Sequence, residues 1–221
     1  MTHPGHLDDV LKALEWLCIE KGMRRYMLVG HSAGATLALQ VLRVLLGGEA
    51  SRYRAGAPPG GIESLGPPPP PPPLPEAIFC LEGIYDLPAL ASEYPHYTSF
   101  ISCAFGPPPS QPPPPTPPPH PWTNASPSSR LHQSIYKAYL QSGIIHLFHS
   151  DQDELLSLSQ LKLMDKCLTE AMGGNVAGKV VTMSEMCGGH DEVLGNRRVF
   201  GVVERAVREV EEVWRGRKWR V

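Results

Sequence analysis

The sequence contains RYMLVGHSAGATLALQVLRVLL at residues 25–46, a G-x-S-x-G pattern between a short apolar run and a long helix-forming run. In that context the pattern is typical of a sharp strand-to-helix turn that carries a nucleophilic serine, here Ser32. Gly30 and Gly34 have no Cβ, so we expect them to let strand and helix approach closely. Ser32 then projects above a sheet in a strained backbone conformation. The N–H of Ala33 lies at a helix start, where it can stabilise an oxyanion.

Short apolar runs alternate with amphipathic segments along the rest of the chain. The runs of strand type are 25–29, 77–81, 144–148 and 179–183. The helical segments are 6–20, 35–46, 97–105, 130–141, 156–172 and 191–214. This alternation predicts an α/β fold with a mostly parallel sheet flanked by helices. Ligand sites in such sheets lie at the carboxyl ends of the strands, so the residues that follow strands are the candidates for chemistry.

Three carboxylates follow the third strand: Asp151, Asp153 and Glu154. An acid in this place would accept a hydrogen bond from a histidine Nδ1–H and stabilise the imidazolium. Asp153 precedes the apolar pair that leads into the next helix, the usual position of such an acid, so it is preferred. Asp151 and Glu154 remain alternatives, and all three could instead cap the helix that begins near residue 156.

His190 lies in the loop after the last predicted strand. Gly188 and Gly189 precede it and let the loop reach back toward the sheet. A lone loop histidine is usually a solvated surface residue. The chain order serine, aspartate, histidine favours a base that takes the proton of Ser32 and returns it to the leaving group.

The composition places limits on the class of protein. The chain has 221 residues, enough for one domain, so we expect a single domain over 1–221. A net charge of -2 offers no basic surface for nucleic acid or an anionic membrane. The polar N-terminus has no signal-peptide pattern, which predicts a cytoplasmic protein. The five cysteines form no CxxC or Cys/His cluster, so the sequence gives no sign of a zinc site.

Most of the 25 prolines lie in two stretches, residues 57–75 and 107–128. Runs of proline exclude a packed strand or helix and favour extended polyproline II. We interpret both as proline-rich, disordered insertions in loops. Such runs are also ligands for SH3 or WW domains, which makes a partner of that kind a further candidate.

Five segments together resemble one family, fungal kynurenine formamidase (arylformamidase) of the α/β-hydrolase superfamily. They are VGHSAGATLALQ at 29–40, LEGIYDLPAL at 81–90, YTSFISCAFG at 97–106, HSDQDELLSLSQ at 149–160 and GGHDEVL at 188–194. The resemblance implies an α/β-hydrolase fold with the triad Ser32, Asp153 and His190. It implies hydrolysis of N-formyl-L-kynurenine to L-kynurenine and formate, in tryptophan catabolism, without metal or cofactor.

For the flat aromatic leaving group of such a substrate, Tyr85, Tyr97 and Phe100 are candidate pocket residues, and core or surface positions are the alternative for each. The expected partner is this small molecule, with a homodimer as a further candidate. Two other functions stay open: a general carboxylesterase of the same fold, and a catalytically impaired chain that acts through its proline runs.

The sequence departs from the resembled family upstream of the elbow. The family carries an HGGxW segment whose backbone N–H groups complete the oxyanion hole, and His-Gly-Gly-x-Trp does not occur in this chain. The strands before that segment are missing as well. We therefore expect a shortened chain without the N-terminal strands, with an exposed sheet edge and a weaker oxyanion hole.

Overall fold

Four parallel strands form the centre of the structure, a computed structural model that describes residues 2–47, 71–108 and 120–216. The strands lie in the order β1-β2-β3-β4, and each neighbouring pair is parallel. Their bounds are Met27–His31 for β1, Ala77–Leu81 for β2, Ile144–Ser150 for β3 and Val180–Glu185 for β4. The predicted parallel sheet is confirmed, and its four carboxyl ends share one edge.

Helices connect the strands. The longer ones are α1 (Gly5–Glu20), α2 (Ala33–Leu46), α8 (Leu158–Ala171) and α9 (Arg197–Gly216). The shorter α-helices are α4 (Leu87–Glu93), α5 (Thr98–Phe105), α6 (Pro121–Ala125) and α7 (Gln133–Tyr139). Three 3-10 turns are η1 (Pro95–Tyr97), η2 (Arg130–His132) and η3 (Glu192–Gly195).

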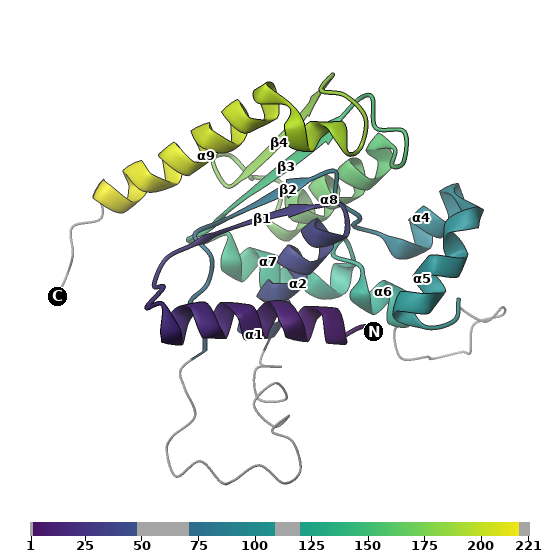
Figure 1. Cartoon of the computed structure of the whole chain (residues 1–221), viewed down its shortest axis with the longest axis horizontal. Helices are drawn as coiled ribbons and strands as arrows, with labels where there is room; N and C mark the ends of the chain where they lie inside the picture. The colour runs from purple at the N-terminus through teal and green to yellow at the C-terminus, as the bar shows by residue number, and fades with distance from the viewer. Residues whose placement is uncertain (1, 48–70, 109–119, 217–221) are drawn as a thin grey trace, which may run out of the picture.

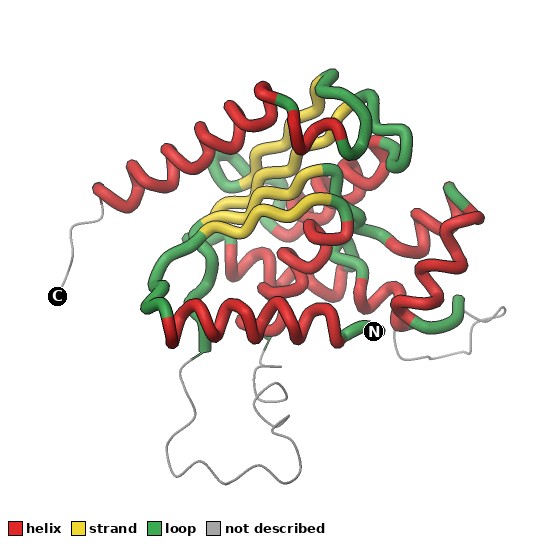
Figure 2. The backbone as a smooth tube through the Cα atoms, viewed as in Figure 1, coloured by secondary structure: helices red, strands yellow, loops and turns green. Residues whose placement is uncertain are grey.

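The sheet is covered on both faces, which gives three layers (Figures 1 and 2). Helices α2, α7 and α8 pack on one face with α1 outside α2, and η3 and α9 lie on the other face. β2 is buried at all five positions because both of its faces are covered. Its side chains alternate between the two cores: Ile78 and Cys80 join the α2–α8 side, while Phe79 and Leu81 join the α9 side.

β1 forms one edge of the sheet. Among the described residues it has a strand neighbour on one side only, and Val29 in its middle is 51% exposed. This is the exposed edge expected of the fold without its N-terminal strands.

The predicted elements need several corrections. β1 begins and ends two residues later than the predicted strand 25–29, and β4 continues to Glu185. The predicted helix 191–214 is two elements, η3 and α9, because extended backbone at Asn196 separates them. Helix α4 was not predicted, although the side chain of Asp86 caps it by accepting from the N–H of Ala89.

Residues 57–70 of the first proline-rich stretch and 109–119 of the second lie outside the described residues. The predicted insertions extend too far at their described ends, which are packed against the rest of the structure. Helix α6 lies within 107–128, where Trp122 is 2% exposed and its Nε1 donates to the carbonyl of Gly106 over 3.0 Å. Proline gives α6 its first residue, where no N–H is required. At the end of 57–75, the hydroxyl of Tyr26 donates to the carbonyl of Pro73 over 2.6 Å. The single domain over 1–221 stays a prediction.

Within the described part of the chain, no helix is both long enough and apolar enough to cross a membrane.

Candidate active site

The turn between β1 and α2 has the predicted elbow geometry. Ser32 is the single residue between the last residue of β1 and the first of α2, and its backbone has φ 55° and ψ -122°. A positive φ is strained for a residue with a Cβ and is characteristic of functional sites. The N–H of Ser32 donates to the carbonyl of Leu81 over 2.9 Å, which ties the turn to the end of β2.

The two glycines of the elbow differ in their steric environment. A Cβ on Gly30 would collide with the backbone of Gly34 and with the N–H of Ala35, so glycine is required there. A Cβ on Gly34 would meet no described atom within 4 Å. The expectation that both glycines prevent a clash is therefore right for Gly30 and wrong for Gly34.

Ala33 is the first residue of α2, and it is exposed at the carboxyl edge of the sheet. Its N–H has no acceptor within the helix, as for any first helical residue. The helix dipole adds positive potential at this point. These are the properties that a donor to an oxyanion needs.

The structure joins the predicted acid and base directly. Oδ2 of Asp153 accepts from Nδ1 of His190 over 2.8 Å, and both side chains are almost fully buried. The other oxygen, Oδ1, accepts from the N–H groups of Leu155 and Leu156 over 2.8 and 2.9 Å. The carboxylate is thus held on both sides while one oxygen faces the imidazole.

The alternative acids occupy other positions. Asp151 is exposed, and Oε2 of Glu154 accepts from the backbone N–H of His190 over 3.0 Å rather than from the ring. Asp153 is accordingly the partner of the ring among the three. Burial opposes its ionisation, but the hydrogen bonds that it accepts from His190 and the backbone hold the pKa of Asp153 well below its ordinary value.

A second buried acid, Glu82, lies at the same imidazole, and it was not among the residues predicted for the site. It directly follows β2, is 0% exposed, and its Oε2 lies 3.1 Å from Nδ1 of His190. Its Oε1 accepts from the N–H of Ser150 over 3.0 Å. The sequence feature that could have indicated Glu82 is its position, because it is an acid immediately after a fully apolar strand of a parallel sheet.

The two carboxyl groups near Nδ1 change the pKa of His190. Burial by itself would lower the pKa of His190, but the contacts with Asp153 and Glu82 outweigh it and raise that pKa to about 10. Burial raises the pKa of Glu82 to about 7, above its ordinary value. The protonation of each of the three groups therefore depends on the protonation of the other two.

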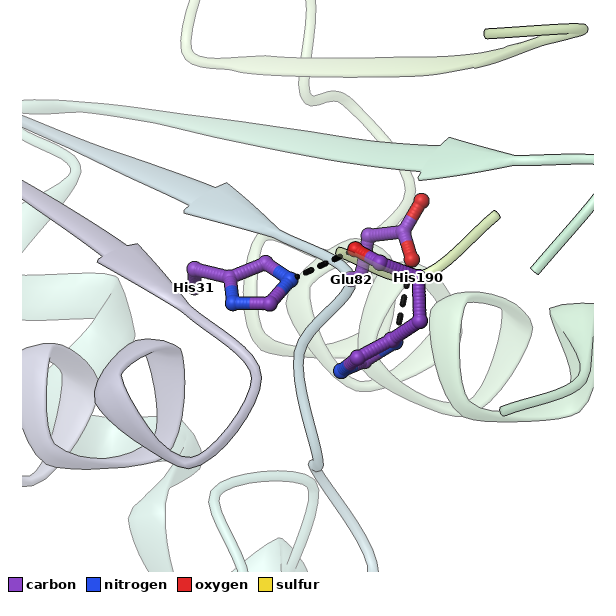
Figure 3. A group of neighbouring side chains, drawn as sticks. All are labelled: His31, Glu82 and His190. Carbon is purple, nitrogen blue, oxygen red and sulfur yellow. Dashed lines mark hydrogen bonds and ion pairs between the residues drawn. The ribbon is translucent and has the colours of Figure 1, made fainter. Parts of the chain in front are cut away.

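Two further histidines flank the base. Nε2 of His31 lies 2.9 Å from the backbone oxygen of His190, and the centres of the two rings are 4.6 Å apart. Figure 3 shows how these two side chains and Glu82 lie. Nε2 of His149 lies 3.0 Å from the carbonyl oxygen of Leu156. Burial lowers the pKa of both His31 and His149, so both are neutral at pH 7. Both rings lie against the site as neutral hydrogen-bonding groups.

The loop that carries the base is held at its start. Ser150 Oγ donates to the carbonyl of Gly188 over 2.6 Å, and the N–H of Gly188 donates to Gln152 over 3.0 Å. Gly188 has a φ of +96°, a conformation that glycine adopts without strain. This is the conformational freedom predicted for Gly188, and it presents His190 to the edge of the sheet.

A largely apolar cavity of about 280 Å³ opens beside the elbow. Ala33 and Leu37 of α2 line it, together with Leu87, Phe100 and Phe105. The prediction for Phe100 agrees with this position.

The two tyrosines predicted for this pocket lie elsewhere. Tyr97 is not among the residues that line the cavity. Its ring packs at a tilt against Phe100 with ring centres 5.0 Å apart, and its hydroxyl donates to the carbonyl of Leu155 over 3.1 Å. Tyr85 is fully buried in the core between the sheet and α7, which corrects its expected place in an open pocket.

Donor atoms of His31, Glu82 and His190 lie within 4.8 Å of one another, the spacing of a small cation site. Two of the nitrogen atoms in this cluster already face oxygen atoms: Nδ1 of His190 faces two carboxyl groups, and Nε2 of His31 faces a carbonyl.

Solved structures of two esterases share this fold. A carboxylesterase from Lactobacillus plantarum matches 90% of the chain over 60% of its own length, with a TM-score of 0.55 and 16% identity. A truncated carbohydrate esterase from gut microbiota matches 95% of the chain over 69% of its length, with a TM-score of 0.55 and 15% identity. With its serine elbow at the carboxyl edge of a parallel sheet, the chain has the fold of the α/β hydrolases.

Curated relatives show which family within this fold the chain resembles. Kynurenine formamidase of Meyerozyma guilliermondii is 34% identical over 169 residues, 74% of this chain and 52% of the relative. That of Saccharomyces cerevisiae is 32% identical over 77% of this chain and 58% of its own length. That of Debaryomyces hansenii is 30% identical over 92% of this chain and 73% of its own length. The chain belongs to the kynurenine formamidase family.

The chain spans little more than half the length of the first two of these relatives. No family model matches it.

Proposed function

We propose that the chain is a serine hydrolase that cleaves N-formyl-L-kynurenine to L-kynurenine and formate. One observation carries the proposal: Asp153 and His190 are hydrogen-bonded at the sheet edge, and the loop of His190 is joined to the elbow through His31. Membership of the family supplies the substrate. The named relatives are kynurenine formamidases, and they match about three quarters of this chain.

The first half of the reaction forms a formyl-enzyme. Ser32 Oγ attacks the formyl carbon while Nε2 of His190 accepts the hydroxyl proton. The negative charge passes to the formyl oxygen, which the N–H of Ala33 stabilises. The C–N bond then breaks, and the imidazolium gives its proton to the arylamine nitrogen, so L-kynurenine leaves.

The second half releases formate. His190 takes a proton from a water molecule as its oxygen attacks the formyl ester. The bond to Ser32 Oγ breaks, and the imidazolium returns the proton to that oxygen. Asp153 stays ionised throughout and stabilises each imidazolium through Nδ1.

The apolar cavity beside Ala33 accepts the flat arylamine in this proposal. Phe100 lies against the aromatic ring of the substrate, and the ring of Tyr97 packs against Phe100. No basic side chain is among the residues that line the cavity apart from two histidines, His3 and His6. An apolar wall suits the aromatic part of the substrate, while the formyl group reaches the elbow.

The general carboxylesterase is the second candidate, because the structural neighbours are esterases. The test measures hydrolysis of N-formyl-L-kynurenine and of p-nitrophenyl acetate by the full chain, with Ser32→Ala as the control. A rate on the formamide that disappears in Ser32→Ala supports the proposal. A rate confined to the acetate supports the esterase, and failure of a fluorophosphonate to label Ser32 supports a non-catalytic chain.

A cytoplasmic location, a homodimer and an SH3 or WW partner remain predictions from the sequence. Most of the longest proline runs lies outside the described residues, so the SH3 or WW partner rests on composition alone.

A further inference from the structure

The buried carboxyl of Glu82 has no task in the three-residue mechanism. Its backbone has a φ of +47°, the one positive φ besides Ser32 among the described non-glycine residues. Its N–H donates to the carbonyl of Phe148 over 2.9 Å, and its Oε1 accepts from Ser150. These contacts hold the side chain under the imidazole, and strain at such a position is characteristic of function.

The other oxygen of this carboxyl, Oε2, indicates what the side chain does. Oε2 has no hydrogen-bond partner, although it is fully buried and lies 3.1 Å from Nδ1 of His190. The single Nδ1–H already donates to Asp153 over the shorter distance of 2.8 Å. A buried, unpartnered carboxylate oxygen is costly, and a proton on it removes that cost by donating to Asp153.

We propose that Glu82 is a positioning residue of this site, whose carboxyl shares one proton with the imidazole of His190 across Asp153 and so controls when His190 is a base. The inference rests on the proposed serine-hydrolase mechanism. It adds a fourth group to that mechanism, acting through His190 rather than on the substrate.

The proton count of the three groups is explicit. With one proton shared, it resides either on Glu82, which leaves a neutral imidazole, or on His190, which leaves two carboxylates around an imidazolium. Only the first arrangement can accept the proton of Ser32. A second proton gives a neutral Glu82 beside an imidazolium, and loss of both gives a neutral imidazole between two carboxylates.

The sign of the effect follows from the charge. An ionised Glu82 favours the imidazolium, as a pKa of His190 raised to about 10 indicates. Replacing the carboxyl with an uncharged amide removes that anion at every pH. The imidazole of the variant must therefore lose its proton at lower pH than that of the wild type.

Other ionisable groups face this cluster from the surrounding elements. They come from the end of β1, from β3 and the loop after it, and from the loop before η3. They are His31, His149, Asp151, Glu154, Cys187 and Asp191. The first two are neutral at pH 7, and the exposed acids are screened by solvent, so Glu82 and Asp153 are the charges closest to Nδ1.

The test compares wild type, Glu82→Gln and Glu82→Asp. The amide keeps the size of the side chain and an oxygen acceptor for the N–H of Ser150. Histidine-selective 15N NMR follows the titration of the His190 ring, assigned by its absence in His190→Gln. The rate of fluorophosphonate labelling of Ser32 is measured over the same pH range.

We expect the His190 titration and the acidic limb of labelling to move to lower pH in Glu82→Gln, by about 1 to 3 units. Glu82→Asp, which keeps a charge, retains a titration closer to that of the wild type. The matched control Glu185→Gln removes an exposed carboxylate at the end of β4 and leaves the titration unchanged.

An unshifted His190 titration in folded Glu82→Gln overturns the proposal, as does an equal shift in Glu185→Gln. The NMR titration needs no turnover. If the chain fails to hydrolyse N-formyl-L-kynurenine, the proposed function fails while the NMR result still decides the role of Glu82.

Discussion

Nε2 of His31 lies 2.9 Å from the backbone oxygen of His190, so the elbow and the loop of the base are joined by one hydrogen bond. The ring N–H is the donor, since a carbonyl can only accept. His31, inside the G-x-S-x-G motif, therefore also contacts the loop of the proposed base.

His31→Leu removes this donor and keeps an apolar side chain of similar size. The loop of His190 then loses its tether to the elbow, and we expect kcat/KM on N-formyl-L-kynurenine to fall by about 10- to 100-fold. Circular dichroism checks that the variant is folded. Full activity in a folded His31→Leu would show that the loop is held without this bond.

The acid is distinguished by substitution at three neighbouring positions. Asp153→Asn places an amide at Nδ1 of His190, which disfavours the productive tautomer, and we expect kcat to fall by about 10³- to 10⁴-fold. Asp151→Asn and Glu154→Gln cause much smaller losses, because neither side chain contacts the ring. Steady-state kinetics of the three variants decides the matter. A loss at Asp151 as large as that at Asp153 would contradict the assignment.

The two elbow glycines should respond differently to alanine. Gly30→Ala forces a methyl group into the backbone of Gly34, and we expect the free energy of unfolding to fall by about 1–3 kcal/mol or more. Gly34→Ala meets open space within helix α2, so its stability changes by no more than about 0.5 to 1 kcal/mol and in the favourable direction. Urea unfolding measures the free energy of unfolding of both variants. Equal losses of stability would contradict the close contact between Gly30 and Gly34.

His146 on β3 makes stability depend on pH. It stacks on Phe79, its Nε2 is buried without a hydrogen-bond partner, and burial lowers its pKa to about 4. Between pH 4 and about 6.5 the unfolded chain binds a proton here that the folded chain does not. The contribution of His146 therefore lowers stability as pH falls through this window, by up to about 1.4 kcal/mol per pH unit.

His146→Leu removes this dependence. We expect the free energy of unfolding of the wild type to fall more between pH 6.5 and pH 5 than that of the variant. Urea titrations at the two pH values make the comparison. Parallel changes in both proteins would show that His146 is solvated or paired in solution.

Phe100 tests the substrate pocket. The ring is 48% exposed at the cavity beside Ala33, and Phe100→Ala should raise KM for N-formyl-L-kynurenine by roughly three- to tenfold with less effect on kcat. Leu131→Ala, at a similarly exposed apolar residue outside the cavity, is the control. An equal effect of both substitutions, or none at Phe100, would place the substrate elsewhere.

Local sequence patterns were sufficient to predict the elbow between β1 and α2. The residues from β1 to α2 are contiguous, so apolar runs on either side of G-x-S-x-G predicted both elements and the strained serine between them. Strand order predicted that one acid after β3 would lie near His190, because parallel strands bring their carboxyl ends to one edge. The contact in the structure then selected Asp153 from the three candidates. Tyr85 was misplaced, because a tyrosine after a strand can turn into the core as readily as into a pocket.

What the sequence by itself determined is the set of elements and the order of chemical groups at strand ends, because both follow from short-range periodicity and chain direction. Only the tertiary structure decided which carboxyl groups meet His190. Glu82 reaches Nδ1 because β2 lies beside β3 and its backbone turns to a positive φ at that residue. Contacts between side chains distant in the chain depend on packing in three dimensions, which no local pattern records.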